Sequence, residues 1–434
     1  MIMIVISEIC SRRDELPSAG VSAERKLSAM RKWGTLFLSL ILFLAPCAQA
    51  EPPIPTEGIV IPVMNELKSF DLPENEAMAT VRSMKAGWNL GNTFDSFADY
   101  GDGRSAGDGM ETYWNNPRTT PELMASLREA GFNTLRLPVS WHNHVDEHYV
   151  INPDWLNRVI EVADYALSLD MYVIVNIHHD NHENPSAFFY PDEAHFEQSA
   201  AYLQAIWTQL AAAFADRDEH LILESMNEPR LVGSSYEWSW NAASKECKES
   251  ADCINRLNQL FVDTVRASGG RNATRYLMVP AYCAAPWNAV NTLFRLPEDP
   301  AENRLIVSAH AYTPYPFALE PGKGDSVFSM DDTAKKSEIA VFLNELYRRF
   351  VAKGIPVVMD EFGAVERNGN LQDRVNFTAW YVACASIRGI TCCWWDNGIF
   401  SGEGERFGLI NRRTLQWVYP DIPLTIDQNS LINR

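Results

Sequence analysis

Eight short apolar segments, each suited to form a β-strand, alternate along the chain with longer segments that have the amphipathic pattern of helices. The strand-like segments are residues 86–89, 134–137, 172–176, 221–225, 276–280, 305–308, 356–360 and 391–395. Strands that alternate with helices form parallel sheets, because the helix returns the chain to the start of the next strand. Eight such repeats over about 310 residues predict one α/β domain, a closed (β/α)8 TIM barrel.

The helical segments carry signals for their own ends. PELMASLREAG follows Thr120, a residue type that caps helix N-termini, and SEIAVFLNELYRRFVAKG ends in basic residues and glycine. No linker-like or low-complexity stretch interrupts the alternation. We therefore expect a short N-terminal leader at residues 51–75 and a single barrel domain at residues 76–425.

The N-terminal region has the pattern of an export signal. Two basic residues precede an apolar run at residues 33–44, and small residues follow at Ala48 and Ala50. The run is shorter than the roughly 20 residues that a membrane-spanning helix needs. We expect residues 1–50 to be a signal peptide with an upstream extension, Met30 being the alternative start. The mature protein would then be secreted or periplasmic, without a membrane span.

The chain has eight cysteines, two of them in this N-terminal region. Cys47 stands in a sequence that approaches a lipoprotein cleavage box, but Pro46 disfavours lipid anchoring there. Cys247 and Cys253 flank the polar stretch KESAD, and an exported protein meets an oxidising compartment, so we predict a disulfide between them. The other cysteines lie in apolar sequence and are expected to be buried free thiols, namely Cys283, Cys384, Cys392 and Cys393.

The chain is acidic, with 56 acidic and 37 basic side chains and a net charge of −19. Such a charge repels the phosphates of nucleic acids and the surface of anionic lipids. These are excluded as partners, and we expect a monomer.

Polar side chains that can take part in catalysis or binding gather at the C-terminal ends of the predicted strands. In a barrel of this kind, that end carries the active site. They are Asn89, Asn92, Arg136, His178, His179, Asp180, Asn227, Glu228, His310, Tyr312, Glu361, Trp395, Asp396 and Asn397. Any one of them alone could simply form hydrogen bonds at the start of a loop. Because seven strands share the feature, it predicts a site.

Two of these residues, Glu228 and Glu361, follow strands on opposite sides of the barrel mouth and are expected to face each other. Cleavage of a glycosidic bond uses two carboxyl groups, one to protonate the leaving oxygen and the other to attack the sugar or to activate water. Arg136 would keep one of them ionised, while partial burial and negative charge would raise the pKa of the other. The pair predicts glycoside hydrolysis.

The neighbouring residues suit the binding of a sugar. Asn227 can hold a sugar hydroxyl, His310 and Tyr312 can orient the nucleophile, and Trp395 offers a flat face to a pyranose ring. Four further tryptophans serve equally well as outer platforms or as core residues, namely Trp88, Trp141, Trp238 and Trp240.

Seven motifs together resemble one known family. They are GWNLGNTFD at 87–95, FNTLRLPVSW at 132–141, NIHH at 176–179, MNEPR at 226–230, HAYTPY at 310–315, DEFG at 360–363 and WWDNG at 394–398. The chain resembles glycoside hydrolase family 5, and within it subfamily 4, whose members are endo-acting β-1,4-glucanases on cellulose, mixed-linkage glucan and xyloglucan. The similarity runs from about residue 60 to 418.

The resemblance implies a retaining endoglucanase that needs no cofactor and no metal and whose partner is a β-glucan polysaccharide. It implies that Glu228 is the acid/base and Glu361 the nucleophile. We expect the substrate to be bound by Asn92, Arg136, His178, His179, Asn227, His310, Tyr312 and Trp395. Asp360 stands where the family pattern predicts glycine, and on an alternating strand its side chain should point to the helices.

Three alternatives remain open at this stage. A mannanase or xylanase could use the same framework, because specificity resides in loop side chains. A metal-dependent hydrolase could use His178, His179, His182 and His310 with Asp180 as ligands. A glycan-binding protein without turnover is the third. The loop at residues 231–253 is either a shaping element of the leaving-group side or a plain surface insertion.

Overall fold

The computed structural model describes residues 52–98, 107–182 and 189–430. Eight parallel strands close into a barrel in which each strand pairs with the next and β8 pairs with β1. The strands are β1 (Ala86–Leu90), β2 (Thr134–Leu137), β3 (Tyr172–Asn176), β4 (Leu221–Glu224), β5 (Leu277–Pro280), β6 (Leu305–His310), β7 (Val357–Phe362) and β8 (Thr391–Asp396). The predicted (β/α)8 TIM barrel is confirmed.

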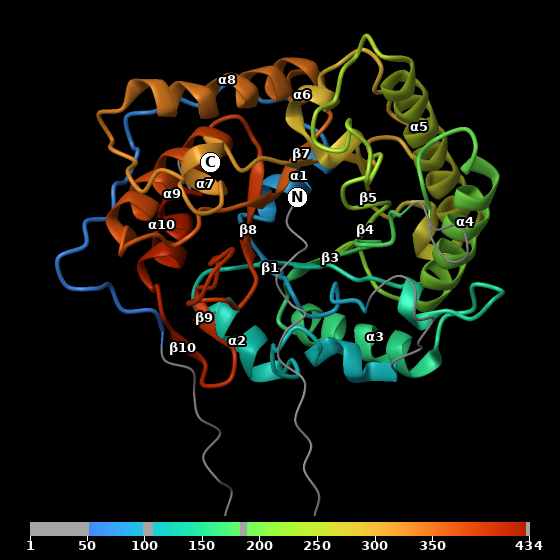
Figure 1. The fold of residues 1–434 in the computed structure, drawn as a ribbon, viewed down its shortest axis with the longest axis horizontal. Helices are drawn as coiled ribbons and strands as arrows, with labels where there is room; N and C mark the ends of the chain where they lie inside the picture. Colours follow the sequence, from blue (N-terminus) through green and yellow to red (C-terminus); the bar gives the residue numbers. More distant parts are fainter. Residues whose placement is uncertain (1–51, 99–106, 183–188, 431–434) are drawn as a thin grey trace, which may run out of the picture. The chain divides into compact units, whose positions relative to one another are not determined.

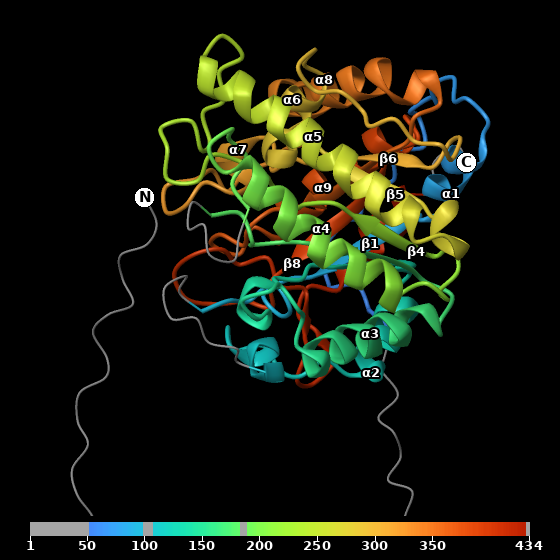
Figure 2. The same ribbon diagram turned by 90° about the vertical axis from the view of Figure 1, so that its right-hand side faces the viewer.

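Helices surround the barrel (Figure 1), and α3, α4 and α5 run along its outer side in Figure 2. The α-helices are α1 (Glu76–Ser83), α2 (Pro121–Glu129), α3 (Pro153–Leu167), α4 (Phe196–Ala213), α5 (Lys245–Ala267), α6 (Pro286–Ala289), α7 (Tyr315–Ala318), α8 (Thr333–Arg349), α9 (Leu371–Ser386) and α10 (Asp421–Asn429). Short 3₁₀ helices are η1 (Gly107–Thr112), η2 (His142–His144), η3 (Gly270–Ala273), η4 (Tyr282–Ala284) and η5 (Val351–Lys353). An antiparallel pair, β9 (Ile410–Asn411) and β10 (Gln416–Trp417), follows β8. Within the described ranges, no helix combines the length and the apolar character needed to cross a membrane.

The helix ends follow the sequence signals. The side chain of Thr120 accepts a hydrogen bond from the backbone nitrogen of Leu123 at the start of α2, and Pro121 occupies the first turn, where its missing N–H costs nothing. Helix α8 ends in Arg348 and Arg349, and η5 then leads to Gly354 in the left-handed conformation.

The side chains that point into the barrel form two layers. The first layer is apolar and comprises Ile174, Ile222, Met278, Ile306, Val358 and Cys393, which pack against Ala77, Val81 and Met84 at α1. Two residues further along four of these strands, the second layer carries the buried polar side chains Asn176, Glu224, Ser308 and Asp360. The buried side chains of Asn89 and Arg136 join it. This polar layer lies next to the strand ends that carry the candidate site.

Residues that precede α1 are bonded to the last helix. The backbone nitrogen and hydroxyl of Thr56 donate to Asp421 at 2.9 and 2.6 Å, and the side chain of Asn429 exchanges hydrogen bonds with Met64 and Pro62. Helix α10 extends to Asn429, past residue 425, where we expected the domain to end. The predicted signal peptide at residues 1–50, with Cys47, lies outside the described residues.

The predicted disulfide between Cys247 and Cys253 is wrong. Ser244 caps α5, so the stretch between the two cysteines forms the first turns of a helix rather than a loop. Residues six positions apart on a helix do not share a face, and both thiols are free and buried. The remaining cysteines are free as predicted, with Cys384, Cys392 and Cys393 buried and Cys283 only partly so.

Candidate active site

Glu228 and Glu361 reach one point at the mouth of the barrel. Glu228 follows β4, and Glu361 lies in β7. One oxygen of each carboxylate and one ring nitrogen of His310 all lie within 4.8 Å of one another. The Nδ1 atom of His310 is 2.8 Å from Oε1 of Glu228 and 3.6 Å from Oε2 of Glu361. The two glutamates therefore converge, with His310 beside both.

Two donors hold Glu361. Nη1 of Arg136 donates to Oε1 of Glu361 at 2.5 Å, and the hydroxyl of Tyr312 donates to Oε2 at 3.0 Å. The fully buried guanidinium of Arg136 also donates to both oxygens of Glu224 at 2.8 and 3.0 Å and to Oδ1 of Asn227 at 2.8 Å. Arg136 thus links the polar layer of the barrel to the carboxylate at its mouth.

The pKa of Glu361 is raised and that of Glu228 is lowered, although Arg136 was expected to keep the carboxylate that it contacts ionised. Burial raises the pKa of Glu361, and the charges of His310 and Arg136 offset this only in part. Burial also acts on Glu228, but the hydrogen bond and charge of His310 and the charge of Arg230 outweigh it and lower the pKa of Glu228. The carboxylate that contacts Arg136 is therefore not the one with the lower pKa. The expectation was wrong because His310 stabilises the charge of Glu228.

The surroundings of His310 favour a ring that is protonated on both nitrogens. Burial alone would lower its pKa, but the charges of Glu361 and Asp360 and the hydrogen bonds to Asp360 and Glu228 raise it well above the ordinary histidine value. A ring in this form can donate from Nδ1 to Glu228, 2.8 Å away, and from Nε2 to Asp360, 3.3 Å away.

Asp360 points into the barrel, which corrects the prediction that it faces the helices. Its carboxylate accepts hydrogen bonds from the backbone nitrogen of Ala309 and the hydroxyl of Ser308, each at 2.9 Å at closest. The register between β6 and β7 shifts so that Ala309 pairs with Met359 while His310 pairs with Glu361. This irregularity breaks the alternation of side chains, so that both Asp360 and Glu361 face inward.

Of the other predicted sugar-binding residues, His178 lies near His310 and Arg136, and His179 lies near Glu228. The rings of Trp395 and His178 stack in parallel at 5.8 Å between centroids, and Nδ1 of His178 lies 3.1 Å from Nδ2 of Asn176. Asn92 has a left-handed backbone, with φ of 55°, and its backbone nitrogen donates to Asp95. Trp395 is 8% exposed and His178 is 4% exposed.

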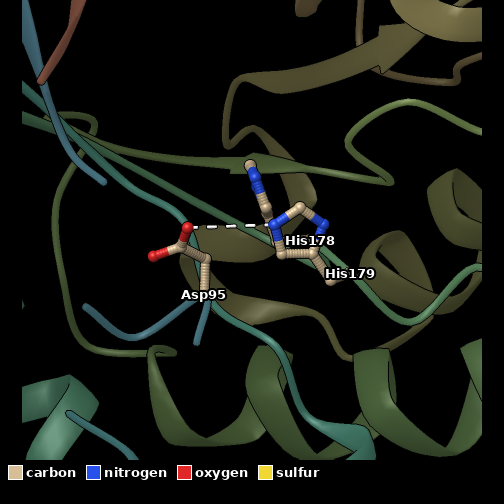
Figure 3. A group of neighbouring side chains, drawn as sticks. All are labelled: Asp95, His178 and His179. Atoms are coloured by element: carbon tan, nitrogen blue, oxygen red, sulfur yellow. Dashed lines mark ion pairs between the residues drawn. The ribbon is translucent and has the colours of Figure 1, made fainter. Parts of the chain in front are cut away.

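His178 and His179 form a group with Asp95 (Figure 3), and Asp180 is not part of this group. Both oxygens of Asp180 are hydrogen-bonded, to the backbone nitrogens of Trp141 and His142 and to the hydroxyl of Tyr202. Asp180 therefore braces loops, which overturns the ligand set considered from the sequence.

In the group of Asp95 with the two histidines, His179 and Asp95 lie further apart than two ligands of a tetrahedral zinc ion. Nε2 of His179 is 3.9 Å from Oδ2 of Asp95, whereas two ligands of a tetrahedral zinc ion lie about 3.4 Å apart. Both oxygens of Asp95 accept hydrogen bonds from the backbone nitrogens of Asn92 and Thr93. Burial raises the pKa of Asp95 to about 6 and lowers that of His179 to about 3.

The four tryptophans considered as sugar platforms or core residues lie partly in the core and partly at the surface. Trp88 and Trp141 are fully buried, and Nε1 of Trp88 donates to Asp396 while that of Trp141 donates to the carbonyl of Asn176. Trp240 is partly buried, while Trp238 is 65% exposed and stacks on the guanidinium of Arg230 at 4.2 Å. Trp238 is the one of the four that presents a broad face to solvent.

Glu224, which is bound to Arg136 in the polar layer, was not predicted from the sequence. Its signal was present as a carboxylate inside the apolar run LILES, where a strand buried on both faces should carry none. Burial raises the pKa of Glu224 to about 8, against the charge of Arg136. Burial therefore favours the protonated form of Glu224, while Arg136 favours the ionised form.

Comparison with known proteins shows which family the chain resembles as a whole. Residues 99–401 match the family described as Cellulase (glycosyl hydrolase family 5). The chain is 43% identical over 348 residues to endoglucanase B of Neocallimastix patriciarum, covering 79% of this chain and 69% of that protein. It spans 41% and 64% of the length of two further curated relatives.

Two solved structures share the fold. A GH5 family lichenase from a Caldicellulosiruptor species is 46% identical, with a TM-score of 0.81, and the match covers 86% of this chain and all of that one. A GH5-4 broad specificity endoglucanase from Ruminococcus champanellensis, solved with bound cellotriose, is 42% identical with a TM-score of 0.75. That match covers 82% of this chain and all of the other.

Proposed function

The chain belongs to glycosyl hydrolase family 5, and we propose that it is a secreted enzyme that cleaves internal β-1,4 bonds of a glucan with retention of configuration. The candidate substrates are cellulose, mixed-linkage glucan and xyloglucan. The relatives named as an endoglucanase, a lichenase and a broad specificity endoglucanase support this substrate class.

In the first step, an ionised oxygen of Glu361 attacks the anomeric carbon. The bond from that carbon to the leaving oxygen breaks, and the leaving oxygen takes a proton from Glu228. In the second step, Glu228 accepts a proton from water, whose oxygen displaces Glu361 and releases the sugar.

The convergence of the two carboxylates is the observation that carries the proposal. Oxygens of Glu228 and Glu361 lie within 4.8 Å of each other, close to the roughly 5–5.5 Å separation of carboxyl groups that favours direct attack over activation of water. Arg136 and Tyr312 fix both oxygens of Glu361 and so aim it. Glu228 shares a hydrogen-bonded proton with His310, which suits a group that gives and takes protons.

The remaining residues would bind the sugar that is attacked. Asn227 is oriented by Arg136, so its amide nitrogen is left to donate to a sugar hydroxyl. Trp395 would lie against the face of a pyranose ring. Asn92, which follows β1, and His178 and His179, which follow β3, would bind further hydroxyls.

A hydrolysis panel tests the proposal. Carboxymethylcellulose, barley glucan, xyloglucan, xylan and mannan are incubated with the wild type and with Glu361→Ala, and product lengths are recorded. We expect glucans to be cut into mixed oligosaccharides by the wild type alone. Release from mannan or xylan alone, or undiminished activity of Glu361→Ala, would refute it.

Export is proposed from the N-terminal sequence. Expression in a host with a secretory pathway, followed by N-terminal sequencing of the released protein, tests it. We expect the mature chain to begin near residue 51.

A further inference from the structure

Asp360 lies inside the barrel, directly behind the two glutamates. Its carboxylate is fully buried and accepts hydrogen bonds from Ser308 and from the backbone nitrogen of Ala309. Oδ2 of Asp360 is 3.2 Å from Nε of Arg136 and 3.3 Å from Nε2 of His310. The glycine that the family resemblance predicts at this position could make none of these side-chain contacts.

His310 bridges Asp360 and Glu228. Its Nε2 faces Asp360, and its Nδ1 faces Oε1 of Glu228 at 2.8 Å. A ring that donates from both nitrogens has only one orientation that serves both acceptors. Asp360 therefore influences Glu228 although the two carboxylates do not touch.

We propose that Asp360 is a positioning residue for acid–base catalysis, which holds His310 and its proton against Glu228. The proposal rests on the proposed function, because it concerns the residue that protonates the leaving oxygen. Asp360 would act on Glu228 only through the imidazole of His310.

The charges around His310 support this role. The groups that face it are Glu228 after β4, Asp360 and Glu361 on β7, Arg136 on β2 and His178 after β3. Arg136 is a second cation, with Nη2 only 3.4 Å from Nε2 of His310. Asp360 lies in contact with both cations and so compensates the repulsion between them.

The proton can pass along this chain of groups without a net change in charge. Nδ1 of His310 gives its proton to Oε1 of Glu228, which leaves a neutral ring that still donates from Nε2 to Asp360. Glu228 gives that proton to the leaving oxygen, and in the second step the proton taken from water returns by the same route. Because His310 and Glu228 share one proton, they titrate as a unit. The negative charge of Asp360 keeps the proton on that unit to higher pH.

Glu224 makes it possible to test the effect of the negative charge of Asp360. It hydrogen-bonds to Asp360 and also contacts Arg136, and burial raises its pKa to about 8. If Asp360 loses its charge, Glu224 can ionise in its place and compensate in part. The double variant Asp360→Asn with Glu224→Gln leaves neither carboxylate able to carry the negative charge.

The experiment measures the pH dependence of kcat/KM on soluble β-glucan for the wild type, Asp360→Asn and the double variant. We expect the alkaline limb to move to lower pH, by about one unit or more in the double variant and by less in Asp360→Asn. Asp180→Asn is the matched control, because Asp180 is an equally buried carboxylate that does not contact His310. Its alkaline limb should not move.

A second substrate separates positioning from general damage. Dinitrophenyl β-cellobioside has a leaving group that departs without protonation, so its kcat/KM should fall far less in Asp360→Asn than that of glucan above neutral pH. Equal losses on both substrates, or an unmoved alkaline limb in a folded double variant, would overturn the proposal. The proposed function would fail separately, through full activity of Glu361→Ala on glucan.

A measurement on the wild type tests the protonation of His310 directly. The ring nitrogens of His310, assigned by their absence in His310→Asn, should report a doubly protonated imidazole at pH 7 by nitrogen-15 NMR. A neutral ring at that pH would overturn the proposal. If Asp360→Asn proves unstable, Asp360→Gly replaces it in the kinetic experiment.

Discussion

Glu361 and Glu228 differ in the groups that hold them, and this difference predicts different kinetic defects. Glu361 is fixed by Arg136 and Tyr312, while Glu228 is bonded to the protonated His310. Glu361→Ala should lose activity on every substrate by several orders of magnitude, because the bond-forming oxygen is gone.

Glu228→Ala should lose glucan hydrolysis by roughly 10²–10⁴-fold, the usual contribution of a general acid. Its kcat/KM on dinitrophenyl β-cellobioside should be almost retained, because that leaving group needs no proton. Added azide should restore turnover in this variant by replacing water without base assistance. If Glu228→Ala lost both substrates equally, the assignment of the acid/base would be contradicted.

The acidic limb of the pH profile should report Glu361. Its pKa is raised by burial, so the enzyme should lose activity at a pH above the ordinary glutamate range as the nucleophile becomes protonated. Tyr312→Phe removes a donor to the ionised form, which raises this pKa further. We expect the acidic limb of kcat/KM to move to higher pH by about half a unit.

Tyr381→Phe is the matched control for that variant. Its buried hydroxyl donates to the carbonyl of Ala311 at 2.9 Å and to no carboxylate. A shift of the same size in both variants, or a shift of Tyr312→Phe to lower pH, would contradict the role given to Tyr312.

Among the elements, β7 shows where reasoning from the sequence stops. The apolar run and the polar end of this strand were predicted to within two residues. The alternation rule then placed Asp360 toward the helices, because nothing in the letters VMDEFG marks the shift in register between β6 and β7. A local irregularity that depends on pairing with another strand is visible only in three dimensions.

The contact between residues 52–75 and α10 is an element-level feature that can be tested. Thr56 donates two hydrogen bonds to the buried carboxylate of Asp421. Thr56→Val and Asp421→Asn should each lower the free energy of unfolding in urea. The double variant should lose less than the sum, with a coupling of roughly 0.5–1.5 kcal/mol. Full additivity would show that the two ends of the domain do not support each other.

For the chain as a whole, the free thiols predict indifference to reducing agents. All six cysteines in the described residues are free. The midpoint of thermal unfolding should be the same with and without dithiothreitol. Alkylation of the unfolded, unreduced protein should add six groups to the mature chain, whereas four would indicate a disulfide.

The barrel and the main site residues could be predicted because both follow from local patterns. Apolar runs gave the strands, and Glu228 and Glu361 stand at strand ends where polarity begins. The polar layer could not be predicted, since Glu224 and Ser308 read as isolated polar letters within apolar strands. Their meaning depends on Arg136, which comes from a distant part of the chain.

The polar layer also limits how such an enzyme could be adapted to high temperature. Larger hydrocarbon side chains in this plane would remove the contacts of Arg136 with Glu224 and Asp360, which lie next to the two glutamates at the barrel mouth. An engineer would leave this plane untouched. Candidate substitutions would be sought instead where α1 packs against the first layer, and along the seam of α10.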